Sequence, residues 1–118
     1  MSLAVLYCPV PDSKTAADIA RGLLEQRLVA CVNIIPAMQS VYWWEGEIKT
    51  ETETLLLAKT TTTNERPITE FIERTHLYTL PCIAFLPLEG VNQAYADFVR
   101  AALAERTAPD AAAQPGGF

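Results

Sequence analysis

The 118-residue sequence has little of what several large classes of protein require. It has one histidine, and no apolar run approaches the roughly 18 residues that a membrane-spanning helix needs. Basic residues are outnumbered, with 9 Lys and Arg against 14 Asp and Glu, so the formal net charge is −5. Because nucleic-acid binding depends on neutralising phosphates with Lys and Arg, this balance argues against a nucleic-acid partner. We therefore expect neither a membrane span nor a nucleic-acid-binding surface.

Cysteines are too few and too scattered for a disulfide framework. Cys8, Cys31 and Cys82 are odd in number and form no CxxC pair. Unpaired cysteines are typical of a reducing compartment, and the first residues lack the basic segment and cleavage site of a signal peptide. We therefore expect a cytoplasmic protein. The simplest role for each thiol is that of a small buried apolar group.

Half of the residues are hydrophobic, which excludes general disorder and suits one domain of this length. The apolar periodicity predicts strands and helices in the order βαββαβ, followed by one further helix. Strands are expected at 3–10, 29–44, 48–59 and 82–88, and helices at 13–28, 64–75 and 91–103. The domain is expected to span 1–107, and the stretch 108–118, rich in Ala, Pro and Gly, to be a flexible tail.

This order is typical of the split βαβ, or ferredoxin-like, fold of the α+β class. Right-handed crossovers give an antiparallel sheet in the order 4-1-3-2, with the two main helices on one face. Pro36 falls in the second strand, which this order puts at an edge, where a sheet tolerates proline. Asn64 is expected to cap the second helix. The second and third strands form a hairpin, in which Gly46 is best able to adopt a positive φ.

The hairpin is too long for an isolated domain of this size. At about 3.3 Å per residue, the stretch 29–44 would span about 53 Å, whereas a usual strand has about 5–6 residues. Its far end must project beyond the helices, yet it carries Tyr42, Trp43 and Trp44. These aromatic side chains could clamp the hairpin turn. The hypothesis that we favour is burial by another subunit, because consecutive strand residues point to opposite faces and would otherwise meet water.

Signatures of common enzymes are missing. The sequence has no Gly-rich phosphate loop, no HExxH motif, and no Ser or Cys nucleophile with a partnered base. Acylphosphatase chemistry on this fold would need an Arg-containing loop after the first strand, and the segment CPVPD at 8–12 contains no Arg. Alternating charges at Lys49, Glu51 and Glu53 indicate a solvated strand face. We therefore predict that the protein is not an enzyme.

Several spaced segments resemble the CutA divalent-cation tolerance family. They are ACVNIIP at 30–36, SVYWWEGEI at 40–48, Lys59 with Thr60, HLYTLP at 76–81, and Tyr95 with Phe98. The resemblance implies a ferredoxin-like homotrimer whose hairpins pair between subunits. It also implies a cytoplasmic role in tolerance to copper and other divalent metals. Trimers of this shape are similar to PII signalling proteins, so a trimeric regulator that binds a small molecule is the alternative function.

The resemblance implies metal ligands as well. Two carry over, Cys8 and His76, while Cys82 stands where the family usually has Glu, and Leu77 where it usually has Pro. In the 4-1-3-2 order the end of the first strand lies beside the start of the fourth, which brings Cys8 near Cys82. Cys31 falls at the opposite end of the sheet, and we assign it to the core.

Two thiols and an imidazole suit Cu(I) or Zn. Copper in either oxidation state and zinc are therefore the candidate ions, and no cofactor is required. The alternative is structural: both thiols face the apolar layer, and His76 hydrogen-bonds to the backbone. A charge of −5 per chain becomes −15 in a trimer, which strengthens the case against nucleic acid and makes metal cations plausible ligands.

Overall fold

The computed structural model describes residues 2–75 and 77–104. The elements are β1 (Leu3–Val10), α1 (Ser13–Glu25), β2 (Cys31–Trp44), β3 (Glu47–Thr61), a 3-10 turn (Thr62–Asn64), α2 (Glu65–Glu73), β4 (Ala84–Leu88) and α3 (Gln93–Ala104). The strands form one antiparallel sheet in the order β2-β3-β1-β4, which confirms the predicted ferredoxin-like topology. The predicted domain end and the tail 108–118 lie outside the described residues.

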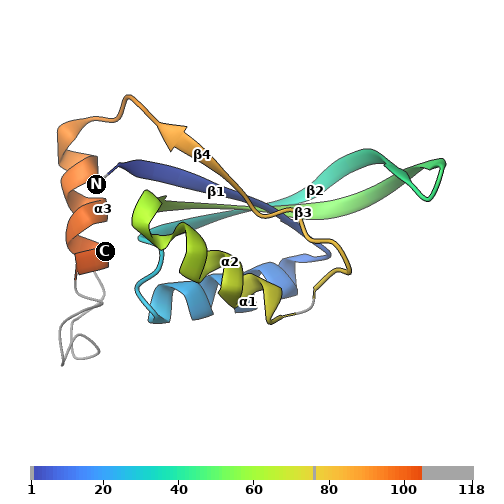
Figure 1. The fold of residues 1–118 in the computed structure, drawn as a ribbon, viewed down its shortest axis with the longest axis horizontal. Helices are drawn as coiled ribbons and strands as arrows, with labels where there is room; N and C mark the ends of the chain where they lie inside the picture. Colours follow the sequence, from blue (N-terminus) through green and yellow to red (C-terminus); the bar gives the residue numbers. More distant parts are fainter. Residues whose placement is uncertain (1, 76, 105–118) are drawn as a thin grey trace.

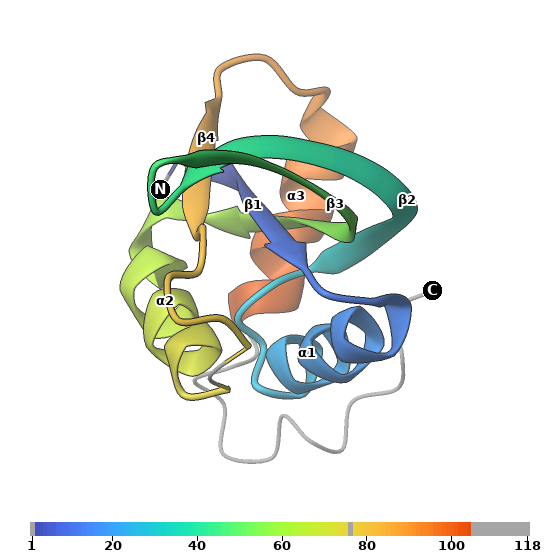
Figure 2. The same ribbon diagram turned by 90° about the vertical axis from the view of Figure 1, so that its right-hand side faces the viewer.

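Helices α1 and α2 lie side by side on one face of the sheet, and α3 packs at its end, beside the start of β1 (Figures 1 and 2). Because side chains alternate along a strand, every second residue of β1 and β3 points to the helices. The main core contains Leu6, Cys8, Val10, Leu56 and Ala58 from these strands, and Ile19, Leu23, Ile68 and Ile72 from the helices. A smaller cluster holds α3 against the body through Leu3, Ala30, Ala96, Val99 and Leu103.

Helix α1 begins as predicted and ends earlier. The Asp12 carboxylate accepts a hydrogen bond from the Thr15 backbone N–H at 2.8 Å, which is the geometry of an N-cap. At the other end Arg27 has φ 57°, a left-handed conformation that a right-handed helix cannot continue. The Leu28 N–H then bonds to the Leu23 carbonyl at 3.0 Å and closes the terminus. The predicted extension of this helix to residue 28 is therefore wrong.

Asn64 precedes α2 but its side chain does not cap the helix, contrary to prediction. It is buried, and its Nδ2 donates to the Leu28 carbonyl at 3.2 Å. The same carbonyl accepts a hydrogen bond from Thr60 Oγ1 at 2.6 Å. The amide therefore connects the end of β3 to the segment that follows α1.

Asn64→Ala is expected to lower the free energy of unfolding by about 1 kcal/mol, because a buried amide loses its hydrogen bond to the Leu28 carbonyl. Urea denaturation measures the change. Thr62→Ala, in the same turn but on an exposed side chain, is the control and should change stability by less than about 0.5 kcal/mol. Equal effects of the two substitutions would contradict this role for the amide.

The last two elements also begin later than predicted. Strand β4 begins at Ala84, so Cys82 lies in the connection before the strand. Helix α3 begins at Gln93, and Val91, which the apolar pattern places in this helix, is 38% exposed before its start. In the part of the chain that the structure describes, no helix is both long and apolar enough to cross a membrane.

The β2–β3 hairpin projects from the body as predicted, and gives the molecule a long axis of 48 Å against 29 and 23 Å (Figure 1). Its two-residue turn has positive φ at Glu45 and Gly46, as a type I′ turn requires. A β-bulge interrupts β2 between Ile35 and Met38, and Ala37 there has φ 63°. Pro36 lies within this bulge on the edge strand, where proline removes no needed ladder bond.

Candidate functional site

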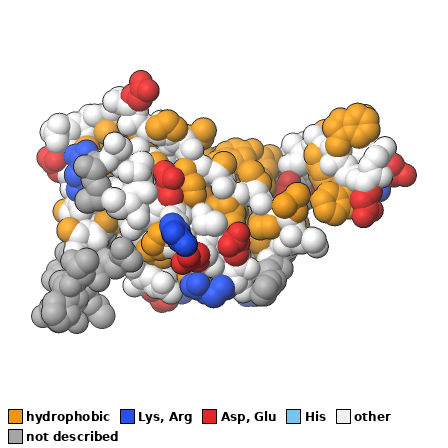
Figure 3. Space-filling view, in the orientation of Figure 1, with side chains coloured by type: hydrophobic (Ala, Val, Ile, Leu, Met, Phe, Trp, Pro, Cys, Tyr) orange, Lys and Arg blue, Asp and Glu red, His pale blue; other side chains and the backbone are white. Residues whose placement is uncertain are grey.

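Strand alternation divides the aromatic segment of β2 between the two faces of the hairpin. Tyr42 and Trp44 share one face, while Trp43 lies on the other, with Val41 beside it and Ile48 across the ladder. Val41, Trp43 and Ile48 are 64%, 71% and 63% exposed, and we call them the exposed hairpin face. Figure 3 shows apolar side chains gathered on this projecting end. The two indoles lie on opposite faces and so do not clamp the turn against each other.

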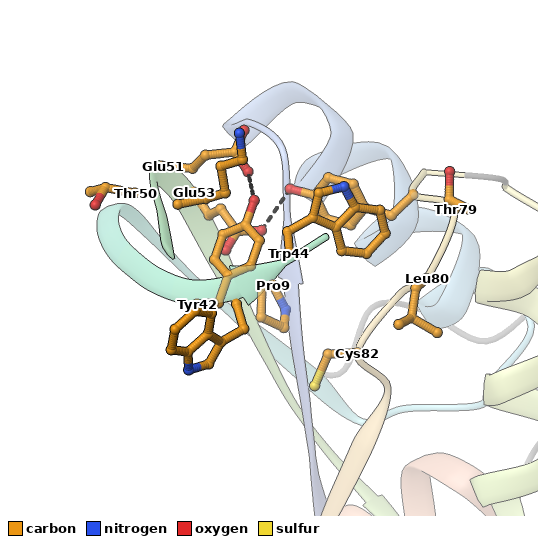
Figure 4. A pocket seen from close by; sticks show the side chains of 12 residues that line it. Pro9, Tyr42, Trp44, Thr50, Glu51, Glu53, Thr79, Leu80 and Cys82 are labelled. Atoms are coloured by element: carbon orange, nitrogen blue, oxygen red, sulfur yellow. Dashed lines mark hydrogen bonds between the residues drawn. The ribbon is translucent and has the colours of Figure 1, made fainter. Parts of the chain in front are cut away.

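Tyr42 and Trp44 face a pocket of about 730 Å³ between the hairpin and the connection that precedes β4 (Figure 4). Its walls combine aromatic, apolar and charged side chains. They are Pro9 of β1, Tyr42, Trp43, Trp44, Lys49, Thr50, Glu51 and Glu53 of the hairpin, and Tyr78, Thr79, Leu80 and Cys82 of the connection. The pocket therefore joins three segments that are far apart in the sequence.

Two phenols hold two carboxylates in this pocket. The Tyr78 hydroxyl donates to Glu53 Oε2 at 2.6 Å, and the Tyr42 hydroxyl donates to Glu51 (Figure 4). Burial, and then the hydrogen bond to Glu53, raise the pKa of Tyr78 well above its ordinary value. The hydrogen bond to Glu51 likewise raises the pKa of Tyr42. Both phenols therefore stay protonated at neutral pH and act as donors to the carboxylates.

Cys8 and Cys82, two of the predicted metal ligands, differ in their burial. Cys8 is fully buried in the main core, and burial, with smaller contributions from Cys82 and Glu53, raises its pKa to about 12. Cys82 is exposed and lines the pocket. The two thiols thus lie near enough to interact electrostatically, as the topology predicted, but in different surroundings. His76 lies outside the described residues.

Within residues 2–75 and 77–104, no group of three or more His, Cys, Asp or Glu side chains is arranged to hold a metal ion. The set Cys8, His76 and Cys82 therefore stays a prediction. Cys31 lies at the opposite end of the sheet, as expected, but it is half-buried and not part of the core. Its Sγ lies 2.9 Å from the Tyr95 hydroxyl.

A family model described as CutA1 divalent ion tolerance protein matches residues 4–102. The chain belongs to the CutA1 family. It is 43% identical over 96 residues to the divalent-cation tolerance protein CutA of Thermus thermophilus, covering 81% of this chain and 93% of that protein. It is 36% identical over 96 residues to the chloroplastic protein CutA 1 of rice (Oryza sativa subsp. japonica). That match covers 81% of this chain but 54% of the rice protein. The chain thus spans about half the length of the rice relative.

Solved CutA structures share the fold. CutA1 from Oryza sativa superimposes with a TM-score of 0.83 at 34% identity, covering 86% of this chain and 94% of that chain. The periplasmic divalent cation tolerance protein CutA from Archaeoglobus fulgidus superimposes with a TM-score of 0.83 at 34% identity, covering 86% of this chain and 98% of that chain. The described ferredoxin-like body with its long hairpin is therefore the CutA1 fold.

The carboxylate pair of this CutA1 chain was missed by sequence reasoning. The alternation of Lys49, Glu51 and Glu53 indicates a solvated face, yet Glu51 and Glu53 accept hydrogen bonds from phenols that line the pocket. Tyr42 lies opposite Lys49 in the ladder, so Glu51 is its diagonal neighbour on the same face. That diagonal could have been found from the hairpin register. The Tyr78 contact could not, because it joins a connection to a strand 25 residues away.

The raised pKa of Cys8 predicts a loss of stability in alkali. The thiol of the unfolded chain ionises near 9.0, whereas that of the folded chain ionises near 12. The resulting stabilisation is complete below pH 9 and is lost as the pH rises towards 12, because the unfolded state releases its proton first.

Urea unfolding at several pH values measures this effect. Cys8→Ala should lose stability less steeply than the wild type between pH 9 and 12. Cys82→Ala, which removes the exposed thiol, is the control and should keep most of the wild-type slope, because burial is the main cause of the raised Cys8 pKa and Cys82 a smaller one. Equal slopes for wild type and Cys8→Ala would show that the buried thiol is not the responsible group.

Proposed function

We propose that this CutA1-family protein is a cytoplasmic homotrimer that acts in the response to divalent and soft metal ions, and that it is not an enzyme. The observation that carries the proposal is the family match over residues 4–102. The Thermus thermophilus and Pectobacterium atrosepticum relatives are both named divalent-cation tolerance proteins. The three free cysteines support a reducing compartment.

Apolar surface supports the homotrimer. The exposed hairpin face extends beyond the body, where a neighbouring subunit can cover it (Figure 1). The sheet face opposite α1 and α2 adds Ile35 and Leu86, which are 46% and 51% exposed. Large exposed apolar side chains such as these are typical of subunit interfaces. Tyr42 and Trp44 lie on the pocket side of the hairpin. Together with Trp43 they are the aromatic residues that the sequence predicts at the interface, and we include them in it.

Charge and ligand chemistry support metal binding. Three chains would carry a net charge of −15, which attracts cations. Cys8, His76 and Cys82 are the proposed ligands, and copper or zinc the proposed ions, because thiols and imidazole prefer them. The raised pKa of Cys8 means that a metal must displace its proton. We therefore expect weak binding at neutral pH that strengthens as the pH rises.

Two measurements test the proposal. Sedimentation equilibrium should give three times 13.0 kDa, about 39 kDa, and a monomer would contradict the trimer. Cu(I) titration under reducing conditions should show weaker binding by the double variant Cys8→Ala/His76→Ala and by Cys82→Ala. Cys31→Ala is the matched thiol control and should bind as the wild type does. Equal affinity in all four proteins would contradict the metal site.

The pocket of about 730 Å³ favours a second candidate function, that of a trimeric regulator of the PII type which binds a small molecule. A volume of this size lies within the range of small-molecule sites, about 300–1,000 Å³. The walls also carry the mixture of apolar surface and a few polar groups that such sites have.

A further inference from the structure

The charges of the pocket at the base of the hairpin are unbalanced. Among the described residues that line it, Glu51 and Glu53 are the carboxylates and Lys49 is the one side chain with a positive charge. Lys49 Nζ lies 3.2 Å from Oε1 of Glu47, a carboxylate that does not line the pocket. The lysine ammonium thus pairs with a carboxylate outside the pocket, and the side chains that line the pocket keep a net negative charge, with Glu51 and Glu53 against Lys49.

These two carboxylates are held in place before any ligand arrives. Each accepts a hydrogen bond from a phenol, Glu53 from Tyr78 and Glu51 from Tyr42. The phenol donates to one oxygen of each carboxylate, which leaves the second oxygen as an acceptor. The Tyr78 bond also ties the connection before β4 to β3, so that both walls of the pocket are fixed relative to each other. A pre-organised site loses less free energy in ordering itself when it binds.

Aromatic and apolar groups form much of the remaining wall. Tyr42 and Trp44 face the pocket, Pro9 of β1 lines it as well, and Leu80 lies across from Tyr42 (Figure 4). Aromatic rings attract cations that are weakly hydrated, such as substituted ammonium groups. A divalent metal ion instead needs several oxygen ligands in a defined geometry, and an apolar wall cannot replace its water. Two carboxylates beside aromatic rings therefore favour an organic cation.

We propose that this pocket binds a small organic cation, with its ammonium group against Glu51, Glu53 and the rings of Tyr42 and Trp44. The proposal rests on the second candidate function and names its ligand class. It does not require the metal site of Cys8, His76 and Cys82. On the hairpin, Tyr42 and Trp44 belong both to this pocket and to the proposed interface, and Trp43 also lines the pocket, so the ligand would bind next to a subunit contact.

Isothermal calorimetry with choline, and with its uncharged analogue 3,3-dimethyl-1-butanol, tests the charge requirement. The wild-type protein should bind choline saturably and bind the alcohol at least tenfold more weakly. Glu53→Gln keeps an acceptor for the Tyr78 hydroxyl but removes the charge, and should weaken choline binding at least tenfold. Glu45→Gln removes a matched charge at the hairpin turn, outside the pocket, and should bind as the wild type does.

Trp44→Leu tests the aromatic wall independently and should also weaken choline binding, without affecting the weak binding of the alcohol. Unfolding midpoints confirm that each variant is folded. Equal binding of choline and the alcohol, or wild-type affinity in folded Glu53→Gln, would overturn the inference. A trimer of about 39 kDa that does not bind choline would overturn this inference and leave the trimer proposal intact. A monomer that binds choline would overturn the trimer proposal and leave this inference intact.

Discussion

Leu56→Ala is expected to lower the free energy of unfolding by about 3–5 kcal/mol, a large share of the stability of a small domain. Leu56 is fully buried near the middle of β3, opposite Cys8 of β1 and Ile34 of β2. Its side chain is part of the core that the two main helices cover. Removing it leaves a cavity that two flanking strands prevent from closing, so the lost packing adds to the lost hydrophobic transfer.

Urea denaturation followed by circular dichroism measures this loss. Leu80→Ala is the matched control, since it makes the same chemical change at a side chain that is 74% exposed, and should change stability by less than about 0.5 kcal/mol. If Leu56→Ala were as stable as Leu80→Ala, the packing described for the sheet would be wrong.

On the proposed trimer, Trp43→Ala combined with Ile48→Ala is expected to shift the mass from about 39 kDa towards the 13.0 kDa of one chain. The two residues lie opposite each other in the hairpin and carry much of its exposed apolar area. Buried interface aromatics often contribute more than about 2 kcal/mol each, so losing one in every subunit weakens every contact of a closed ring. The hairpin ladder itself should remain, because neither side chain is buried within the chain.

Sedimentation equilibrium over a range of concentrations measures the dissociation. Leu24→Ala on α1, which removes an exposed apolar side chain from the opposite part of the molecule, is the control and should remain trimeric. A double variant that still sediments at about 39 kDa would show that the exposed hairpin face is not an interface.

Much of the fold could be predicted from the sequence, because apolar periodicity reports the residues that a sheet and its helices must bury. Strand β1 matches its predicted bounds, and the strand order follows from chirality once the elements are known. The end of α1 could not be predicted in this way. It depends on a left-handed conformation at Arg27, a residue type that does not favour that conformation.

The candidate site was predicted less completely. Topology placed Cys8 and Cys82 near each other, but not the difference in their surroundings, which depends on where β4 begins. The pairing of Tyr78 with Glu53 depends on the path of a connection that has no periodicity to analyse. Asn64 illustrates the same limit, since its type suits a cap, yet its amide bonds instead to a carbonyl 36 residues away.

The bulge at Pro36 and Ala37 determines what the far half of the hairpin presents to its surroundings. Before it, Ile35 pairs with Leu55; after it, Met38 pairs with Glu53, so β2 has advanced by one residue more than β3. A shift of one residue moves a whole row of side chains to the other side of a strand. The one extra residue in the bulge therefore decides which aromatic rings lie beside the carboxylates and which face outward, whatever residues follow it.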